Sequence, residues 1–456
     1  MTLSSMECEH ASPAGNPWPF RPDLPSLGET MIIPKNNAKS HPKHNSKSYT
    51  KYNAICLAAI VSLTSTACLA SSLQENGERT IGEQWVTETM INARANMFNP
   101  NLNFLTFQQL DKMFATRRVA ASSTPWPLET DLIEIDDSFS FEGNEVPLEE
   151  YLENTKTNAL LVIKDGKIVY EQYRNGFSDD SQHAVFSASK SILATLVGIA
   201  VEEGNIESLD DPVTKYLPEL AGTGYNDVRV IDVLRMRSGV AWEEVYEFGG
   251  DTQLTEVHDN ALVANNYRWC DYAIASSEPE YAPGERFNYA TLDTSVLGCV
   301  LASVLDTTVA EYMSEKIWQP AGMEADGFWI MDGGDEFYGA GFNATLRDLG
   351  RFGLMMLHMG EANGNQVVPA HWVTEATVSD PGYEHISEGA DLGYQYQWWT
   401  LPDSDAYTAM GIYNQYIYID PDNQTVVVKL SHTPDAVGWD DDNFAFFDKL
   451  SELVSE

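Results

Sequence analysis

The chain has 456 residues, of which 43 % are hydrophobic and 11 % aromatic, as in a globular protein with room for one large domain or two ordinary ones. Its 68 Asp and Glu residues outnumber 27 Lys and Arg residues, so the net charge at pH 7 is −41. Such an acidic chain offers no basic surface to phosphates, which argues against nucleic-acid binding, and it stays soluble in salty surroundings.

The first 70 residues are predicted to be a leader. Lysines recur at every fourth position from Lys35 to Lys51, and an apolar stretch follows from Ala54 to Ala70. A basic segment, a short apolar segment and small residues at its end are typical of a secretory signal peptide. The stretch is short and rich in Ser and Thr for a membrane span. We therefore expect no stable span, cleavage after Ala70, and a periplasmic or secreted protein.

Two details of this leader leave alternatives open. Cys68 lies near the end of the apolar stretch, so the protein could instead be a lipoprotein anchored through this cysteine. The segment before Met31 is rich in proline and contains acidic residues, which fits no part of a signal peptide. Met31 is therefore a second candidate for the true start.

Residues 71–150 are predicted to form an N-terminal arm and linker. Residues 82–98 have helical spacing, and the Pro- and Ser-rich residues 120–127 are typical of a linker or of an extended segment that wraps around a domain. The remaining residues, 151–456, are predicted to form one domain.

Strands are expected at both ends of this domain. Asp165-Gly166 between two apolar runs, 159–163 and 168–170, predicts a β-hairpin. Residues 413–419 and 425–430 predict a second hairpin, and residues 443–454 a closing helix. The fold class is therefore α/β (α+β type), an antiparallel sheet flanked by helices.

A mainly helical insertion is expected between the strands, at about residues 205–385. Residues 228–236 and 346–358 have the spacing of helices, whereas the acidic and aromatic residues 242–266 have no clear period and are predicted to be a loop. Cys270 and Cys299 either form a disulfide or are two buried thiols. No C-x-x-C or H-x-x-x-H arrangement exists, so no metal site is expected.

The candidate site starts from an S-x-x-K motif, which occurs at Ser40, Ser48 and Ser187. The first two serines lie in the leader, and only Ser187 opens an apolar helix. Residues three apart share one helix face, which brings Lys190 next to Ser187. A serine hydroxyl needs a neighbouring base to act as a nucleophile, and a desolvated lysine can be that base. The competing interpretation is a helix-capping serine followed by a solvated lysine.

Further motifs make the chain resemble the serine β-lactamase-like superfamily, and within it the branch of esterases and 6-aminohexanoate-dimer hydrolases. The resemblance covers about residues 100–450 and implies a β-lactamase/transpeptidase-like fold. The motifs that carry it, in the family's order, are FSASK at 186–190, VLRMRSG at 233–239, PGERFNY at 283–289, GFNATLRDLGRFG at 341–353 and GIYNQYIYIDP at 411–421.

Carried over residue by residue, this resemblance assigns roles to a catalytic group. Ser187 would be the acylated nucleophile and Lys190 its basic partner. Tyr289 would be the tyrosine of the Y-x-N motif, acting as a base beside the charge of Lys190 and relaying the proton to the leaving group. The backbone amides of Ser187 and Ile412 would form the oxyanion hole. A tyrosine that simply packs after a Pro-Gly turn is the competing interpretation of Tyr289.

Three more residues are predicted to bind substrate, and the family's pattern changes at one of them and directly before another. Thr291 replaces the usual Asn of Y-x-N. Gly411 would let the backbone approach substrate, but the preceding Ala409 and Met410 stand where β-lactamases have the Lys and Thr of K-T-G. Trp398 is the third candidate, as an aromatic wall of the pocket, with core packing as its alternative.

These features predict an exported serine hydrolase that cleaves small-molecule carboxylic esters or amides through an acyl-enzyme on Ser187, without a cofactor or metal. The missing K-T-G lysine argues against substrates that require a carboxylate there. The alternatives are a penicillin-recognising hydrolase (β-lactamase or D,D-peptidase) and a non-catalytic binding protein that retains the fold. The oligomeric state has no signature in the sequence.

Overall fold

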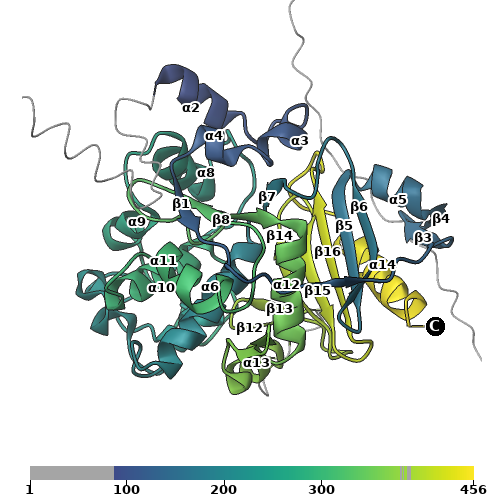
Figure 1. Cartoon of the computed structure of the whole chain (residues 1–456). Coiled ribbons are helices and arrows are strands. Elements are labelled where there is room, and N and C mark those ends of the chain that lie inside the picture. The colour runs from purple at the N-terminus through teal and green to yellow at the C-terminus, as the bar shows by residue number, and fades with distance from the viewer. Residues whose placement is uncertain (1–86, 380–382, 384, 388–391, 456) are drawn as a thin grey trace, which may run out of the picture. The chain divides into compact units, whose positions relative to one another are not determined.

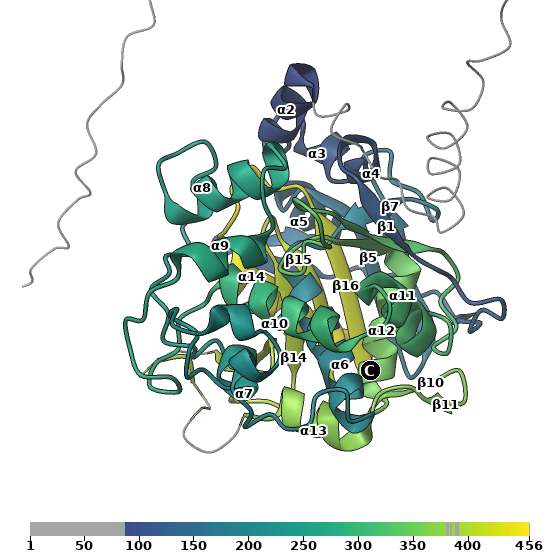
Figure 2. The same cartoon turned by 90° about the vertical axis from the view of Figure 1, so that its left-hand side faces the viewer.

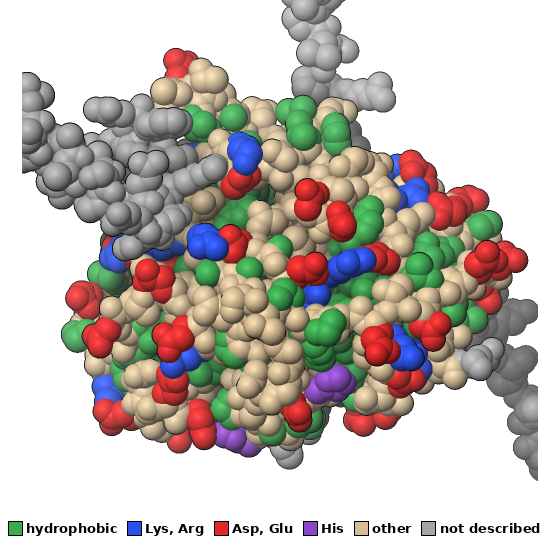
Figure 3. All heavy atoms as spheres, in the orientation of Figure 1, with side chains coloured by type: hydrophobic (Ala, Val, Ile, Leu, Met, Phe, Trp, Pro, Cys, Tyr) green, Lys and Arg blue, Asp and Glu red, His purple; other side chains and the backbone are tan. Residues whose placement is uncertain are grey.

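The computed structural model describes residues 87–379, 383, 385–387 and 392–455, all of which belong to one compact unit (Figures 1 and 2). The predicted leader, its cleavage site and Met31 lie outside the described residues. Acidic side chains are spread over the face shown in Figure 3 and do not gather at one place.

An eight-stranded sheet forms the centre of the unit, as the predicted fold class requires. Its neighbours are antiparallel, except that the edge strand β2 is parallel to β6. The two predicted hairpins are confirmed as β5–β6 and β15–β16, and β16 pairs with β5, so the two ends of the domain meet. In sheet order the strands are β12 (Gly393–Gln395), β13 (Trp398–Thr400), β14 (Tyr407–Gly411), β15 (Gln415–Asp420), β16 (Thr425–Ser431), β5 (Thr157–Lys164), β6 (Lys167–Tyr173) and β2 (Glu129–Thr130).

Helices cover both faces of this sheet because its central strands bury both. In β16, Val426 and Val428 belong to the larger core, whereas Val427 belongs to a smaller one on the opposite face. Helices α6 (Ala188–Glu202) and α12 (Leu346–Leu357) pack on the larger core, and α5 (Leu148–Asn154) and α14 (Asp440–Leu453) lie over the smaller one (Figure 1).

A second, four-stranded sheet leads into the candidate site. Its order is β1 (Thr116–Val119), β8 (Gly327–Ile330), β9 (Phe342–Thr345) and β7 (Gln182–Ala184). Strand β1 comes from the predicted arm, and β8 and β9 come from the range predicted as a helical insertion. Residues 120–127 run extended beside the domain, with the amides of Ser122 and Trp126 donating to the carbonyls of Met323 and Gly322. The wrapped extended segment is therefore the interpretation that the structure supports.

Short helices dominate residues 205–323. The prediction of a loop over residues 242–266 is wrong in part, because α8 (Gln253–His258) and a π-helix, η4 (Asp259–Val263), occupy its second half. A disulfide joins Cys270 and Cys299, which settles the alternative left open by the sequence. The other helices of this region are η2 (Val213–Lys215), η3 (Pro218–Leu220), α7 (Val230–Leu234), α9 (Trp269–Ser276), α10 (Thr291–Val304), α11 (Val309–Met313) and η5 (Ser314–Trp318).

Among the described residues no single helix is long and apolar enough to cross a membrane. Helix α10 together with α11 and η5, bent by 83°, meets the length and composition of a span as a pair.

The remaining elements lie at the periphery. The closing helix begins at Asp440, three residues before the predicted start. The peripheral elements are α2 (Glu88–Ala95), α3 (Asn103–Thr106), α4 (Leu110–Met113), β3 (Ser138–Phe141), β4 (Asn144–Pro147), β10 (Glu361–Ala362), β11 (Asn365–Gln366) and α13 (Ala370–Thr377).

Candidate active site

Ser187 lies in the tight connection between β7 and α6. Phe186, the residue before it, has φ = +45°, a left-handed conformation that costs a non-glycine residue about 1 kcal/mol. Ser187 itself is helical and precedes the first residue of α6, so its hydroxyl lies at the positive end of a 15-residue helix. The packing around a helix that is buried from Ala188 to Ala200 holds this strained turn in place, as is common at catalytic sites.

Lys190 lies one helical turn further on, with its ammonium group buried. Its Nζ is 3.0 Å from Ser187 Oγ, 3.0 Å from Thr291 Oγ1 and 2.7 Å from the carbonyl oxygen of Gly339. Burial lowers the pKa of Lys190 from 10.5 to about 8, while the negative charge of Glu244 acts in the opposite direction. About a tenth of the amine is therefore neutral at pH 7, which supplies a base for Ser187.

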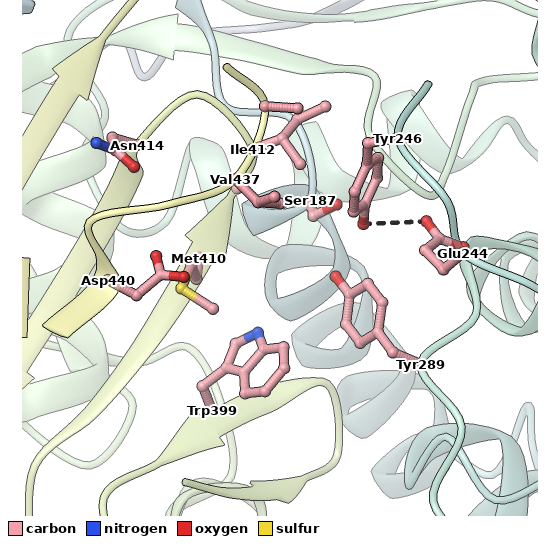
Figure 4. A pocket seen from close by; sticks show the side chains of 12 residues that line it. Ser187, Glu244, Tyr246, Tyr289, Trp399, Met410, Ile412, Asn414, Val437 and Asp440 are labelled. Carbon is pink, nitrogen blue, oxygen red and sulfur yellow. Dashed lines mark hydrogen bonds between the residues drawn. The ribbon is translucent and has the colours of Figure 1, made fainter. Parts of the chain in front are cut away.

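Tyr289 reaches the same hydroxyl from the loop before α10. Figure 4 shows its phenol pointing toward Ser187. Lys190 Nζ lies 5.2 Å from the centre of its ring. Burial raises the pKa of Tyr289 well above 10, and its hydrogen bond with Ser187 only partly offsets this effect. The predicted role of this phenol as a base does not fit that pKa, whereas a proton donor to the leaving group does.

Strand β14 brings the second oxyanion amide close to Ser187. A Cβ on Gly411 would lie 2.2 Å from the carbonyl oxygen of Val185 and 3.2 Å from the Ser187 nitrogen, so only glycine permits this approach. Ile412 follows in the turn to β15 and lines the same cavity as Ser187. In the described part of the chain, no hydrogen bond from the amide of Ser187 or Ile412 is found, which leaves both as donors for an oxyanion.

Glu244 and Tyr246 complete the site, although sequence reasoning missed both. The carboxylate of Glu244 accepts hydrogen bonds from the backbone amide of Thr291 (2.9 Å), from its hydroxyl, and from the phenol of Tyr246 (3.1 Å) (Figure 4). Thr291 therefore bridges Lys190 and Glu244. It lies behind Lys190 and lines a small cavity of about 40 Å³ together with Ser187. Its contact with substrate, as predicted from the sequence, stays a prediction.

Ser187 opens into a cavity of about 290 Å³. Trp399 lines it, and its ring stacks on Tyr289 with centroids 5.4 Å apart. The prediction that Trp398 binds substrate is wrong, because consecutive side chains of a strand point to opposite faces. Trp398 is fully buried in the core, where its ring lies parallel to that of Phe352.

Metal ligands do not gather at this site. Within the described ranges, no group of three or more His, Cys, Asp or Glu side chains is placed to hold a metal ion.

Comparisons with known proteins identify the family of the chain. The family model described as Beta-lactamase matches residues 148–446. A 6-aminohexanoate-dimer hydrolase of Paenarthrobacter ureafaciens is 33 % identical over 302 residues, which are 63 % of this chain and 76 % of that protein.

Two solved structures share the fold. A Bacillus anthracis protein assigned as a 6-aminohexanoate-dimer hydrolase superposes with a TM-score of 0.72 at 24 % identity, over 79 % of this chain and 96 % of that one. A family VIII carboxylesterase superposes with a TM-score of 0.53 at 16 % identity, over 68 % of this chain and 95 % of that one.

Proposed function

Because the chain belongs to the beta-lactamase family, we propose that it is a serine hydrolase that cleaves carboxylic esters or amides through an acyl-enzyme on Ser187. The observation that carries the proposal is the contact of 3.0 Å between Ser187 Oγ and a buried Lys190 whose pKa is about 8. A lysine kept only as a structural cation would not need so dry a position beside a hydroxyl.

In the first half of the reaction, neutral Lys190 accepts the proton of Ser187 Oγ while Oγ attacks the carbonyl carbon of the substrate. The amides of Ser187 and Ile412 bind the resulting oxyanion. When the tetrahedral intermediate collapses, the bond to the leaving oxygen or nitrogen breaks. Tyr289 gives its proton to that atom and regains one from Lys190, so the proton taken from Ser187 leaves with the alcohol or amine.

In the second half, water attacks the acyl carbon and the ester bond to Ser187 Oγ breaks. One proton of the water returns to Oγ through Lys190, and the acid is released. Thr291 and Glu244 hold Lys190 in the position from which it serves both halves.

The substrate class follows from what stands beside the oxyanion hole. Ala409 and Met410 occupy the K-T-G positions, and neither side chain can pair with a substrate carboxylate. A charge-assisted hydrogen bond from such a lysine is worth roughly 1.5–3 kcal/mol. We therefore propose short esters or amides without an obligatory carboxylate at this position. A relative that acts on the amide 6-aminohexanoate dimer supports amides as well as esters.

Labelling with a fluorophosphonate, followed by intact mass and peptide mapping, tests the nucleophile. We expect one adduct on Ser187 and none on Ser187→Ala, with the variant's unfolding temperature as the control for folding. An adduct that persists in Ser187→Ala contradicts the assignment, and a folded protein that is never labelled indicates the binding-protein alternative.

Comparison of two substrates on one preparation tests the class. Values of kcat/KM for p-nitrophenyl butyrate should exceed those for nitrocefin by at least about tenfold, the value of the missing charge-assisted contact. Hydrolysis of nitrocefin at a rate comparable with the ester would favour the penicillin-recognising alternative.

We also infer that the protein is exported. The disulfide between Cys270 and Cys299 supports an oxidising compartment, and the leader has the composition of a signal peptide. N-terminal sequencing of exported protein should give Ser71 as the first residue. A lipid on Cys68 would instead place the protein at a membrane surface.

A further inference from the structure

The cavity at Ser187 extends along β14 to the start of α14. Figure 4 shows Met410 and Asp440 on the side of Ser187 away from Tyr246 and Glu244. At this end Trp399 stacks on Tyr289. In the mechanism proposed above, Tyr289 gives its proton to the leaving group, so a leaving group next to Tyr289 would lie toward the end that Trp399, Met410 and Asp440 line.

Asp440 presents a negative charge to this end of the cavity. One of its carboxylate oxygens accepts a hydrogen bond from the hydroxyl of Tyr416. Among the described residues, no Lys, Arg or His lies within ion-pair distance of Asp440. Lys429 is close enough to act on it electrostatically, but its Nζ donates to Ser431 Oγ, and burial lowers the pKa of Lys429 to about 7. Burial raises the pKa of Asp440, and the charge of Lys429 only partly opposes this effect, so this carboxylate is not held in an ion pair with a described residue.

Two other walls of the cavity complement this carboxylate. The indole of Trp399 lines it, and aromatic rings attract cations. The side chain of Asn414 is only 3 % exposed and lines the same cavity. Figure 4 shows its amide oxygen, a hydrogen-bond acceptor that suits an ammonium group, on the side of the other cavity residues.

We propose that this end of the cavity binds an ammonium group carried by the leaving group of the substrate, between the carboxylate of Asp440 and the face of Trp399. The proposal rests on the hydrolase function proposed above and names its substrate class: esters of amino alcohols and amides of diamines. A carboxylate on the leaving group, such as the one carried by the amine that leaves from a 6-aminohexanoate dimer, would face Asp440 and be repelled, so the proposal predicts that this chain differs from that relative in its leaving group. The acidic surface of the protein favours the approach of the same cations.

Three butyrate esters with leaving groups of similar size test this specificity. Butyrylcholine carries a quaternary ammonium, 3,3-dimethylbutyl butyrate is its neutral isostere, and 3-carboxypropyl butyrate carries a carboxylate. For the wild type we expect kcat/KM to be at least about tenfold higher for the cationic ester than for the neutral one, and lowest for the anionic ester.

Asp440→Asn should remove most of this preference, lowering kcat/KM for butyrylcholine about tenfold while changing that for the neutral ester less than about twofold. Asp441→Asn is the matched control, because Asp441 is the next residue of α14 and is exposed, and it should keep the wild-type preference.

The outcomes separate the two proposals. Turnover of none of the three esters would overturn the hydrolase function itself. Turnover of the neutral ester at a rate equal to or above that of butyrylcholine would overturn the ammonium site alone, and this result needs no variant. If Asp440→Asn does not fold, Asp440→Glu, which retains the charge, should retain the preference. Its loss in a folded Asp440→Glu variant, or its persistence in a folded Asp440→Asn variant, would refute the role of this carboxylate.

Discussion

Replacing Glu244 with Gln tests how the protein sets the proton affinity of Lys190. Lowering the pKa of this lysine from 10.5 to about 8 raises the fraction of neutral amine at pH 7 about 300-fold. The value of kcat/KM for a neutral ester should therefore rise about tenfold per pH unit up to about pH 8 and then level off.

Glu244 opposes this effect because its negative charge, held behind Lys190 by Thr291, favours the ammonium form. Removing that charge should lower the pKa of Lys190 further. The acid limb of the profile should then move to lower pH by about half a unit or more, the scale of one nearby charge. The readout is the position of the limb and not the maximal rate, since Glu244→Gln also weakens the hydrogen bonds to Thr291 and Tyr246.

The assay is kcat/KM for p-nitrophenyl butyrate between pH 5.5 and 9.5 at constant ionic strength, corrected for spontaneous hydrolysis. Glu243→Gln is the matched control, because the neighbouring Glu243 is exposed and should leave the limb in place. A limb that stays fixed or moves to higher pH in Glu244→Gln would refute the electrostatic reasoning, and a flat wild-type profile would refute Lys190 as the base.

Three further predictions concern the proton path, the close approach at Gly411 and the buried Lys429. Tyr289→Phe and Lys190→Ala should each lower kcat about 10²-fold or more and combine non-additively, because both serve one proton path; full additivity would separate them. Gly411→Ala should reduce kcat at least about tenfold, since its Cβ would lie 2.2 Å from the carbonyl oxygen of Val185; wild-type kcat would contradict the close approach. Lys429→Met should raise the unfolding temperature more at pH 6 than at pH 9. Folding lowers the pKa of Lys429 to about 7, so its cost of a few kcal/mol is complete below that pH and fades as pH rises toward 10.5. The exposed Lys167→Met control should change the unfolding temperature equally at both pH values. An equal rise at both pH values for Lys429→Met would contradict a charged lysine in the core.

The features that sequence predicts well here are local ones. Asp165-Gly166 specifies its hairpin through turn chemistry, and the apolar run after Ser187 specifies a buried helix, so the Ser187–Lys190 contact follows from helical spacing alone. The helix α8 and the π-helix η4 are only six and five residues long, too short for a period to appear among acidic and aromatic residues. Glu244 escaped notice for a different reason, because its partner Thr291 lies 47 positions further on.

The two neighbouring tryptophans show why the sequence alone does not identify the one that lines the cavity. A pair of aromatic residues in a strand predicts that one faces each side, but the register decides which one. Here Trp399 pairs with Thr408, and it is Trp399 that faces the cavity while Trp398 packs in the core. The sequence predicts that the two side chains face opposite sides, but not which of them faces the cavity.

Asp440 shows the same limit of sequence-based prediction for a residue with a proposed function. The absence of a K-T-G lysine is legible in the sequence, because Ala409 and Met410 directly precede Gly411. The carboxylate at this end is not legible, because Asp440 belongs to α14 and reaches the cavity only when that helix packs behind β15 through Tyr416. A motif search shows only that the K-T-G lysine, and with it a cation for a substrate carboxylate, is missing. The fold instead places the carboxylate of Asp440 on the wall of the cavity, and under the proposal above this carboxylate would select a different leaving group.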